Sequence, residues 1–280
     1  MRILLAVVVL TACSPSDRDN PATDGPSQPD TQPDSLPPVD MSRVYAHSGQ
    51  TLYLLNSATL ATTTIGTMSQ LGTQSLTDLA IDKDDNMVGV TLDKLYSIDA
   101  TTGNATLIKD LSEDVDNTTS LSFVPEDIND PSSPDMLVTA NSFGEVFRID
   151  PATGAATLLG NYGTVAQGQV RSSGDLFAVH GLGIFATVDI GDGQGPSNDY
   201  LASIDPVTWK ATPIGAGTGF DKIFGVGFWG GIIYGFVDLG ASNGGQIIQI
   251  DPNTGAGTLL SSSSVRWFGA GVATDAPVLE

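Results

Sequence analysis

The stretch VFRIDPATGAATLL, residues 146–159, decides how this chain folds, because near copies of it recur along the sequence. The copies are LYSIDATTGNATLI at residues 95–108, LASIDPVTWKATPI at 201–214, IIQIDPNTGAGTLL at 247–260 and a more divergent LYLLNSATLATTTI at 52–65. Successive copies start 43 to 55 residues apart. Repetition with a period of this size indicates one structural unit per copy, with the units packed against one another.

Each copy predicts a strand, a tight turn and a second strand. Before the turn, apolar residues such as Phe147 and Ile149 alternate with their neighbours, which is typical of a strand with one buried face. The turn reads Asp-Pro-x-Thr-Gly, in which Asp caps the turn, Pro presets φ and Gly accepts a positive φ. An aspartate that recurs in four of the five copies is better explained as a turn cap than as a catalytic acid, because a catalytic group is needed once. These aspartates are Asp99, Asp150, Asp205 and Asp251.

Two further strand candidates lie between consecutive copies, for example at residues 76–82 and 86–91. Two pairs of strands per unit are typical of the four-stranded blade of a β-propeller. The first copy is preceded by only one strand candidate, residues 43–47, and the last is followed by an unassigned one, WFGAGVAT at 267–274. Pairing of these two segments closes the ring and leaves no open sheet edge. We therefore predict an all-β fold, a single β-propeller of five four-stranded blades, with six blades as the alternative.

The N-terminus has the pattern of an export signal. Arg2 precedes an apolar run at residues 3–10, which is too short to span a bilayer as a helix. Residues Leu10-Thr11-Ala12-Cys13 resemble a bacterial lipobox, and that resemblance implies cleavage before Cys13 and lipidation of its thiol and new amino group. The alternative is an ordinary signal peptide followed by an incidental cysteine. Because Cys13 is the only cysteine, no intramolecular disulfide is possible.

Composition divides the chain into three parts. We predict a lipoprotein signal peptide at residues 1–12, a lipidated cysteine with a disordered linker at 13–40, and the propeller at 41–280. Residues 14–40 contain seven prolines and six aspartates and almost nothing apolar, so they cannot form a core. Fully extended, this linker reaches roughly 80 Å from a membrane.

The chain is strongly acidic. Lys and Arg number 11 against 32 Asp and Glu, for a net charge of −21. Such a charge disfavours nucleic acid and anionic membrane surfaces as partners. It is compatible with cation binding or with a basic partner.

The longest inserts between a second strand and the following copy are residues 189–200 and 238–245. They belong to neighbouring blades and share a propeller face, so we expect them to lie close together. Their carboxylate and amide oxygens, on glycine-rich loops, are suited to Ca²⁺ or to a polar ligand, the alternative being loop residues that only promote solubility. The candidate binding residues are Asp189, Asp192, Asn198, Asp199, Asp238 and Asn243. With two histidines, one cysteine and no G-x-S-x-G, the sequence supports no zinc site and no catalytic residue.

The repeated Ile-Asp-Pro-x-Thr-Gly-x-Ala-Thr-Leu phrase resembles that of exported bacterial propellers akin to quinoprotein-like and WD40-like repeat domains. The resemblance covers about residues 43–274 and implies a scaffold without a cofactor motif. Together with the lipobox it is similar to a propeller lipoprotein of a Gram-negative envelope. Ser14 after the cysteine is compatible with sorting to the outer membrane, on its periplasmic face or at the cell surface.

Three functions are compatible with these features. The first is a membrane-anchored, monomeric module that binds a ligand, a protein or a glycan in the cell envelope. The second is a metal-assisted hydrolase or lyase acting on extracellular sugars or lactones. The third is a structural subunit of an envelope assembly. The absence of a recognisable nucleophile in the sequence favours the first.

Overall fold

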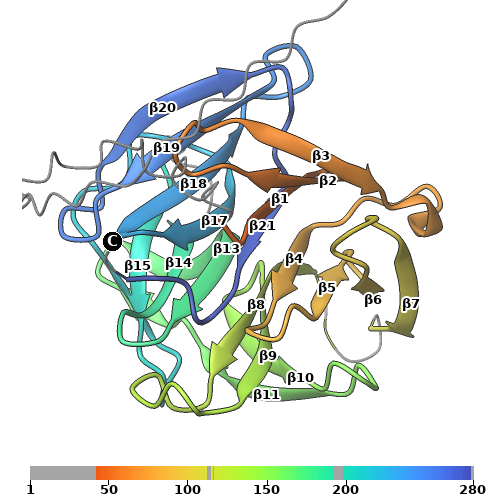
Figure 1. Cartoon of the computed structure of the whole chain (residues 1–280). Helices are drawn as coiled ribbons and strands as arrows, with labels where there is room; N and C mark the ends of the chain where they lie inside the picture. The colour runs from red at the N-terminus through yellow and green to blue at the C-terminus, as the bar shows by residue number, and fades with distance from the viewer. Residues whose placement is uncertain (1–41, 112–114, 116, 192–197, 279–280) are drawn as a thin grey trace, which may run out of the picture. The chain divides into compact units, whose positions relative to one another are not determined.

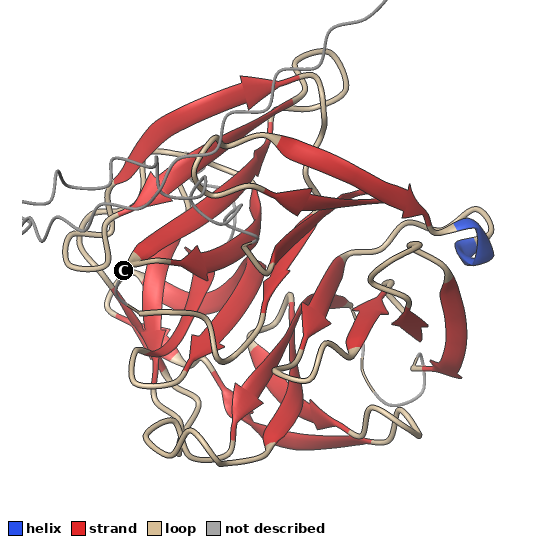
Figure 2. Ribbon diagram, in the orientation of Figure 1, coloured by secondary structure: helices blue, strands red, loops and turns tan. Residues whose placement is uncertain are grey.

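The computed structural model describes residues 42–111, 115, 117–191 and 198–278. In these ranges five antiparallel sheets surround a common axis as the blades of a β-propeller (Figures 1 and 2). A short 3-10 turn, η1 (Ser69–Leu71), is the only helical segment within them. The prediction of an all-β fold with five blades is confirmed. The predicted signal peptide, Cys13 and the linker lie outside the described residues.

Each blade is a sheet in which successive strands are neighbours, written here from the axis outward. Blade 1 consists of β21 (Gly269–Val272), β1 (Val44–Ser48), β2 (Thr51–Leu55) and β3 (Thr62–Thr67). Blade 2 consists of β4 (Asp78–Ile81), β5 (Met87–Val90), β6 (Lys94–Ile98) and β7 (Ala105–Asp110). Blade 3 consists of β8 (Thr118–Pro125), β9 (Asp135–Asn141), β10 (Glu145–Ile149) and β11 (Ala156–Asn161).

Blade 4 has a fifth, short strand that the sequence did not indicate. From the axis outward its long strands are β13 (Gly168–Val179), β14 (Gly183–Ile190), β15 (Tyr200–Ile204) and β16 (Ala211–Pro213), and the short strand β12 (Thr164–Val165) pairs with the first residues of β13. Blade 5 consists of β17 (Ile223–Trp229), β18 (Ile232–Asp238), β19 (Gly245–Ile250) and β20 (Gly257–Ser263). The inner strands of the five blades are therefore β21, β4, β8, β13 and β17.

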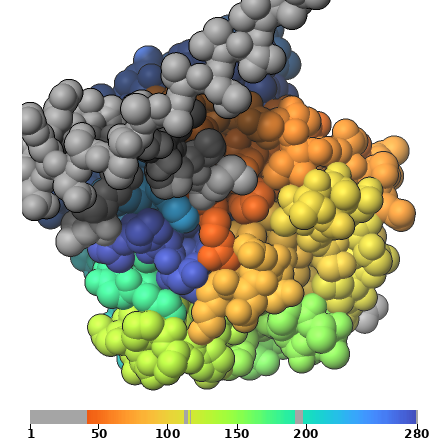
Figure 3. Space-filling view, viewed as in Figure 1, coloured from red at the N-terminus to blue at the C-terminus, as the bar shows by residue number. Residues whose placement is uncertain are grey.

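The last strand of the chain closes the ring, as predicted. β21 pairs antiparallel with β1, with Val272 opposite Val44 and Gly269 opposite His47. In the space-filling view the start of the ring and the C-terminal part of the chain adjoin at the centre of the visible face (Figure 3). Just before β21, Trp267 is 1% exposed and makes edge contacts with Tyr53 of blade 1 and Phe236 of blade 5, at ring-centroid distances of 5.4 and 5.5 Å. This buried ring therefore joins the two blades that the closure brings together.

The repeated aspartates cap turns, as expected from their recurrence. Asp150 Oδ1 accepts hydrogen bonds from the N–H groups of Ala152 and Thr153 at 2.8 and 3.1 Å. Asp99, Asp205 and Asp251 accept the equivalent pairs. Hydrogen bonds donated by the turn lower the pKa of all four carboxyls, since they favour the ionised form.

Trp209 occupies the position that glycine holds in other copies of the turn, and it adopts the same backbone conformation. Its φ is 59°, compared with 69° for Gly154, although the left-handed region is unfavourable for a bulky side chain. The indole is only 4% exposed and packs into the core shared by blades 3 and 4. Burial of the ring offsets the backbone strain, so this copy keeps the turn type of the others.

Within the described ranges, no helix is both long and apolar enough to cross a membrane.

Candidate ligand-binding site

A cavity lies on the propeller axis, on the face where the inner strands begin. It has a volume of about 430 Å³ and receives at least one residue from every blade. In order from blade 1 to blade 5, these residues are Phe268 just before β21, Thr77 just before β4, Thr119 in β8, Gly174 in β13 and Phe224 in β17. We call this space the mouth cavity. Its position at the convergence of five blades makes it a product of the closed ring.

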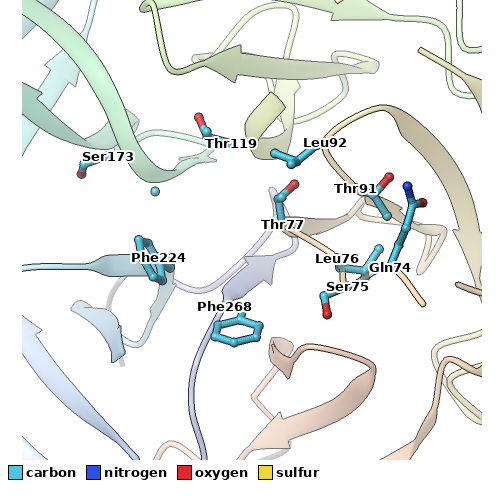
Figure 4. Close-up of a pocket in the computed structure, with 11 residues that line it drawn as sticks. Gln74, Ser75, Leu76, Thr77, Thr91, Leu92, Thr119, Ser173, Phe224 and Phe268 are labelled. Atoms are coloured by element: carbon cyan, nitrogen blue, oxygen red, sulfur yellow. The ribbon is translucent and has the colours of Figure 1, made fainter. Parts of the chain in front are cut away.

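The wall of the mouth cavity combines carbon-rich surfaces with hydroxyl groups. Figure 4 shows the side chains surrounding a common space, with Ser173 at the opposite end from Gln74 and Thr91. The apolar members are Leu76, Leu92, Phe224 and Phe268. The polar members are Gln74, Ser75, Thr77, Thr91, Thr119 and Ser173. Apolar walls with a few hydrogen-bonding groups are typical of sites for small molecules.

Two carboxyl groups follow cavity-lining residues in the inner strands. Asp78 comes directly after Thr77, Asp175 comes directly after Gly174, and both side chains are fully buried. Asp78 Oδ1 and Oδ2 accept the N–H groups of Leu79 and of Leu121 in β8, each at 2.8 Å. Asp175 makes the same pattern with Leu176 at 2.6 Å and with Val226 of β17 at 2.7 Å. Each carboxyl therefore ties its own inner strand to that of the next blade.

The two carboxyls also hydrogen-bond to each other across the axis. A hydrogen bond between two carboxyl groups requires a proton on one of them. Burial raises the pKa of both groups well above the usual range for aspartic acid. For Asp78, the neighbouring charge of Asp175 raises it further.

His47 of β1 packs beside this pair. It is fully buried, and burial lowers its pKa to about 3, so the imidazole is neutral at physiological pH. Gly269, its partner in β21, has no room for a side chain. A β-carbon there would lie 2.4 Å from His47 Nε2 and 2.5 Å from Asp78 Oδ1. Glycine at residue 269 is thus required by the polar groups on the axis.

A second group of carboxylates adjoins the mouth cavity at its Ser173 end. Asp199, between blades 4 and 5, is 2% exposed and accepts the N–H of Ile223 at 2.7 Å, next to the cavity-lining Phe224. Burial raises the pKa of Asp199 to about 7, and the charges of Asp189 and Asp221 add to that effect. We call Asp189, Asp199 and Asp221 the side cluster.

The structure places the predicted binding residues in two groups. Asp189 lies close enough to Asp199 to raise its pKa, and so does Asp221, which the sequence did not single out. Asn198 lies beside them, with its Oδ1 accepting the N–H of Gly219 at 2.8 Å. Asp192 lies outside the described residues.

Asp238 and Asn243 have partners of their own. Asp238 binds Arg266 through both carboxylate oxygens, at 2.8 and 2.7 Å, and the hydrogen bonds from Arg266 help to hold its pKa below the usual range against the effect of burial. Asn243 Nδ2 donates to the Leu239 carbonyl at 3.3 Å, within its own loop. Among the described residues, no group of three or more His, Cys, Asp or Glu side chains is arranged to hold a metal ion. Calcium at the predicted positions stays a prediction.

The sequence contained a signal for Asp78 and Asp175, which we call the axial pair, but the repeated phrase drew attention away from it. Asp78 and Asp175 both open the pattern Asp-Leu in a run of otherwise small or apolar residues, TDLAI at 77–81 and GDLFA at 174–178. A carboxylate inside a strand that is buried on both faces needs compensating hydrogen bonds. Its recurrence in two inner strands could have marked both residues as groups facing the axis.

Neither a family model nor a curated protein matches the sequence. Among solved structures, the chain is similar to a protein of unknown function from Bacteroides thetaiotaomicron, with 16% identity, a TM-score of 0.48, and coverage of 69% of this chain and 53% of that one. The chain thus spans about half of that protein's length. It is also similar to a gluconolactonase from Xanthomonas campestris, with 14% identity, a TM-score of 0.41, and coverage of 66% and 60%. For BamB from Moraxella catarrhalis the values are 16%, 0.37, 82% and 61%. At these identities the likeness concerns the fold alone.

Proposed function

We propose that this chain is a lipid-anchored protein of the bacterial cell envelope whose propeller binds a small, largely apolar molecule in the mouth cavity. The observation that supports this proposal most directly is the cavity itself, about 430 Å³ at the meeting point of five blades. Its four large apolar side chains line a space in which an apolar ligand would exclude water. Burial of such surface is the main source of affinity for small ligands.

The anchoring part of the proposal rests on the N-terminal sequence. The apolar run, the lipobox-like Leu10-Thr11-Ala12-Cys13 and the proline-rich residues 14–40 together have the pattern of a lipid anchor with a spacer. A spacer of this length lets a propeller sample a volume around its attachment point. A binding protein on such a tether remains in the envelope while it collects its ligand.

Replacing Leu92 with serine is expected to weaken binding of an apolar probe about fivefold. Leu92 lines the mouth cavity but is 55% exposed in the free protein, so a ligand can still bury part of its side chain. Loss of that burial corresponds to about 1 kcal/mol. The measurement is a fluorescence titration of the full chain carrying Cys13→Ser with the neutral dye N-phenyl-1-naphthylamine, which brightens in apolar surroundings.

Leu158→Ser is the matched control for this titration. Leu158 is also an exposed leucine, at 59%, but it lies in the outer strand β11, away from the axis. It should leave the affinity unchanged, and both substitutions should leave the melting temperature nearly unchanged because both side chains face solvent. Equal affinities for the two variants, or no binding by the parent chain, would show that the mouth cavity is not a ligand site.

Replacing Cys13 with serine is expected to release the chain from the membrane fraction. Serine has no thiol to carry a lipid, and the remaining sequence contains no other cysteine. The measurement is fractionation of cells labelled with an alkyne analogue of palmitate, with Ser16→Ala as the control that should stay labelled and membrane-bound. Labelling that persists in Cys13→Ser would contradict the lipid anchor.

A further inference from the structure

Three inner strands are irregular at the mouth cavity, in the manner of β-bulges. The pairing with the second strand of the blade skips Thr119 in β8, residues 173–175 in β13 and Phe224 in β17. Thr119, Phe224 and two of the three skipped residues of β13 line the cavity. A bulge re-aims side chains that regular pairing would place elsewhere, and bulges recur beside binding sites. The irregular parts of three neighbouring blades therefore shape the wall of the cavity.

The irregularity in β17 places Phe224 against the inner strand of blade 4. A β-carbon at Gly174 would lie 2.1 Å from the Ile223 carbonyl oxygen and 2.8 Å from Phe224 Cα. Only a residue without a side chain permits this approach. The close contact between the two inner strands thus sets the position of Phe224, whose half-buried ring forms part of the cavity wall.

Phe268, the second aromatic ring of the wall, packs against a fixed cation. The Arg266 guanidinium lies 4.8 Å from the ring centre. Its Nε and Nη2 donate to the two carboxylate oxygens of Asp238 at 2.8 and 2.7 Å, and the Asp238 side chain is only 4% exposed. A two-point contact of this kind fixes the plane of a guanidinium. Within the described part of the chain, Phe268 lines the cavity and Arg266 does not, so Arg266 supports the ring from another side.

The backbone around Phe268 is fixed as well. The Phe268 N–H donates to the His47 carbonyl at 3.0 Å, and Gly269 continues the pairing with β1 as the first residue of β21. On the other side, the buried Trp267 packs between blades 1 and 5. A ring that is already held in one orientation loses little conformational entropy when a ligand packs against it.

The two rings give the mouth cavity an aromatic side. Figure 4 shows Phe224 and Phe268 on the same side of the space, with Leu92 across from them. Offset-stacked and edge-to-face contacts between aromatic rings are favourable beyond the area that they bury. A saturated molecule of the same carbon skeleton does not gain this contribution. The fixed rings therefore favour a flat aromatic ligand over an aliphatic one.

We infer that the ligand of the mouth cavity is a flat aromatic molecule that packs against Phe224 and Phe268, and that Asp238 and Arg266 are positioning residues for the Phe268 ring. This inference rests on the proposed function and specifies its ligand class. It also assigns a role to Asp238, whose carboxylate acts on the cavity through Arg266 and Phe268.

The test compares two alcohols that share a carbon skeleton and differ in aromaticity. 2-Naphthol is flat and aromatic, decahydro-2-naphthol is saturated, and both are uncharged at neutral pH. Isothermal titration of the full chain carrying Cys13→Ser should show 2-naphthol binding at least about tenfold more tightly than decahydro-2-naphthol.

Phe268→Leu removes the ring but keeps an apolar side chain. It should lower the affinity for 2-naphthol about fivefold and leave that for decahydro-2-naphthol nearly unchanged. Phe143→Leu is the matched control, because Phe143 is 49% exposed in the turn between β9 and β10 and does not line the cavity. This control should change neither affinity.

Arg266→Lys tests the positioning role. Lysine keeps the charge that Asp238 binds but lacks the planar two-point contact, so the affinity for 2-naphthol should fall about threefold while decahydro-2-naphthol is unaffected. Arg148→Lys is the matched control, since Arg148 Nη2 also binds a carboxylate, that of Glu126 at 2.7 Å, on an exposed part of blade 3. A merely structural role of Arg266 would lower the melting temperature without changing the preference for the aromatic alcohol.

The parts of the proposal fail differently. If 2-naphthol binds no more tightly than decahydro-2-naphthol, or if Phe268→Leu weakens both equally, the aromatic ligand class is wrong. If Phe268→Leu removes the preference and Arg266→Lys retains it in full, the positioning role is wrong. Binding of N-phenyl-1-naphthylamine decides the proposed function separately, because failure of that dye to bind as well would show that the cavity is not a ligand site.

Discussion

Replacement of Asp78 with alanine should lower the free energy of unfolding by about 2–6 kcal/mol. The substitution leaves the N–H groups of Leu79 and Leu121 buried without an acceptor, each at a cost of about 1–3 kcal/mol. It also removes the group that carries the proton shared with Asp175. Urea unfolding followed by circular dichroism measures the change, and Asp175→Ala should give a similar loss through Leu176 and Val226.

An exposed aspartate provides the control for this loss. Asp84, in the β4–β5 turn, faces solvent, and Asp84→Ala should change the stability by less than about 0.5 kcal/mol. Equal and small effects at residues 78, 84 and 175 would contradict a structural role for the axial pair.

The shared proton also predicts how stability depends on pH. Burial raises the pKa of both axial carboxyls in the folded protein, so the folded state binds a proton that the unfolded state releases above a pH of about 4. The contribution of this proton is complete below that pH and declines as the pH rises toward the raised folded-state pKa. Stability from the axial pair should thus fall with rising pH, opposite to the trend of the turn aspartates, whose pKa is lowered.

Asp78→Asn isolates this effect. An amide at residue 78 can still accept a backbone N–H and can donate a hydrogen bond to an ionised Asp175 without a titratable proton. The variant should therefore lose much of the decline in stability between neutral and alkaline pH. An unchanged pH profile in Asp78→Asn would show that the two carboxyls do not share a proton.

Removal of residues 267–280 should abolish cooperative folding. The truncation deletes β21 and the buried Trp267, which contacts Tyr53 and Phe236. Loss of a buried Trp side chain alone costs about 3–5 kcal/mol, a large part of the roughly 5–15 kcal/mol by which a domain is stable. The exposed edge of β1 would also be free to pair with other chains. We expect no sharp thermal transition by circular dichroism and oligomers on size-exclusion chromatography.

A circular permutant is the control for this truncation. Val272 lies opposite Val44, so the end of β21 is close to the start of β1. A chain that begins with residues 266–276, continues through a short glycine-rich linker to residue 42 and ends at 265 retains the same pairing. It should melt cooperatively as a monomer. Cooperative melting of the truncated chain near the parent's melting temperature would contradict the role of the closing strand.

The repeated phrase was enough to predict the blades because its signals are local. The alternation around Phe147 and Ile149 and the hydrogen bonds from Asp150 to its own turn depend on residues a few positions apart. Ring closure could also be predicted, since an unpaired strand at each end of the chain requires a partner. The short strand β12 of blade 4 escaped prediction because two residues carry no recognisable period.

The sequence named the candidate site residues without their partners. Asp189 and Asp199 lie close enough for the charge of Asp189 to raise the pKa of Asp199, and a ligand at these residues stays a prediction. Asp238 was assigned to the same site from its loop, and the sequence did not reveal that Arg266, 28 residues away, hydrogen-bonds to it. Which cation neutralises which carboxylate depends on the packing of neighbouring blades, and the spacing of residues along the chain does not reveal it.

The sequence by itself thus determined the all-β class, the number of blades and the strand that closes them, because turn chemistry and strand periodicity act over short distances. Only the tertiary structure decided that Asp78 and Asp175 face each other across the axis and that all five blades contribute to one cavity. These residues lie 97 positions apart in the chain, and only the curvature of the closed ring brings them within hydrogen-bonding distance.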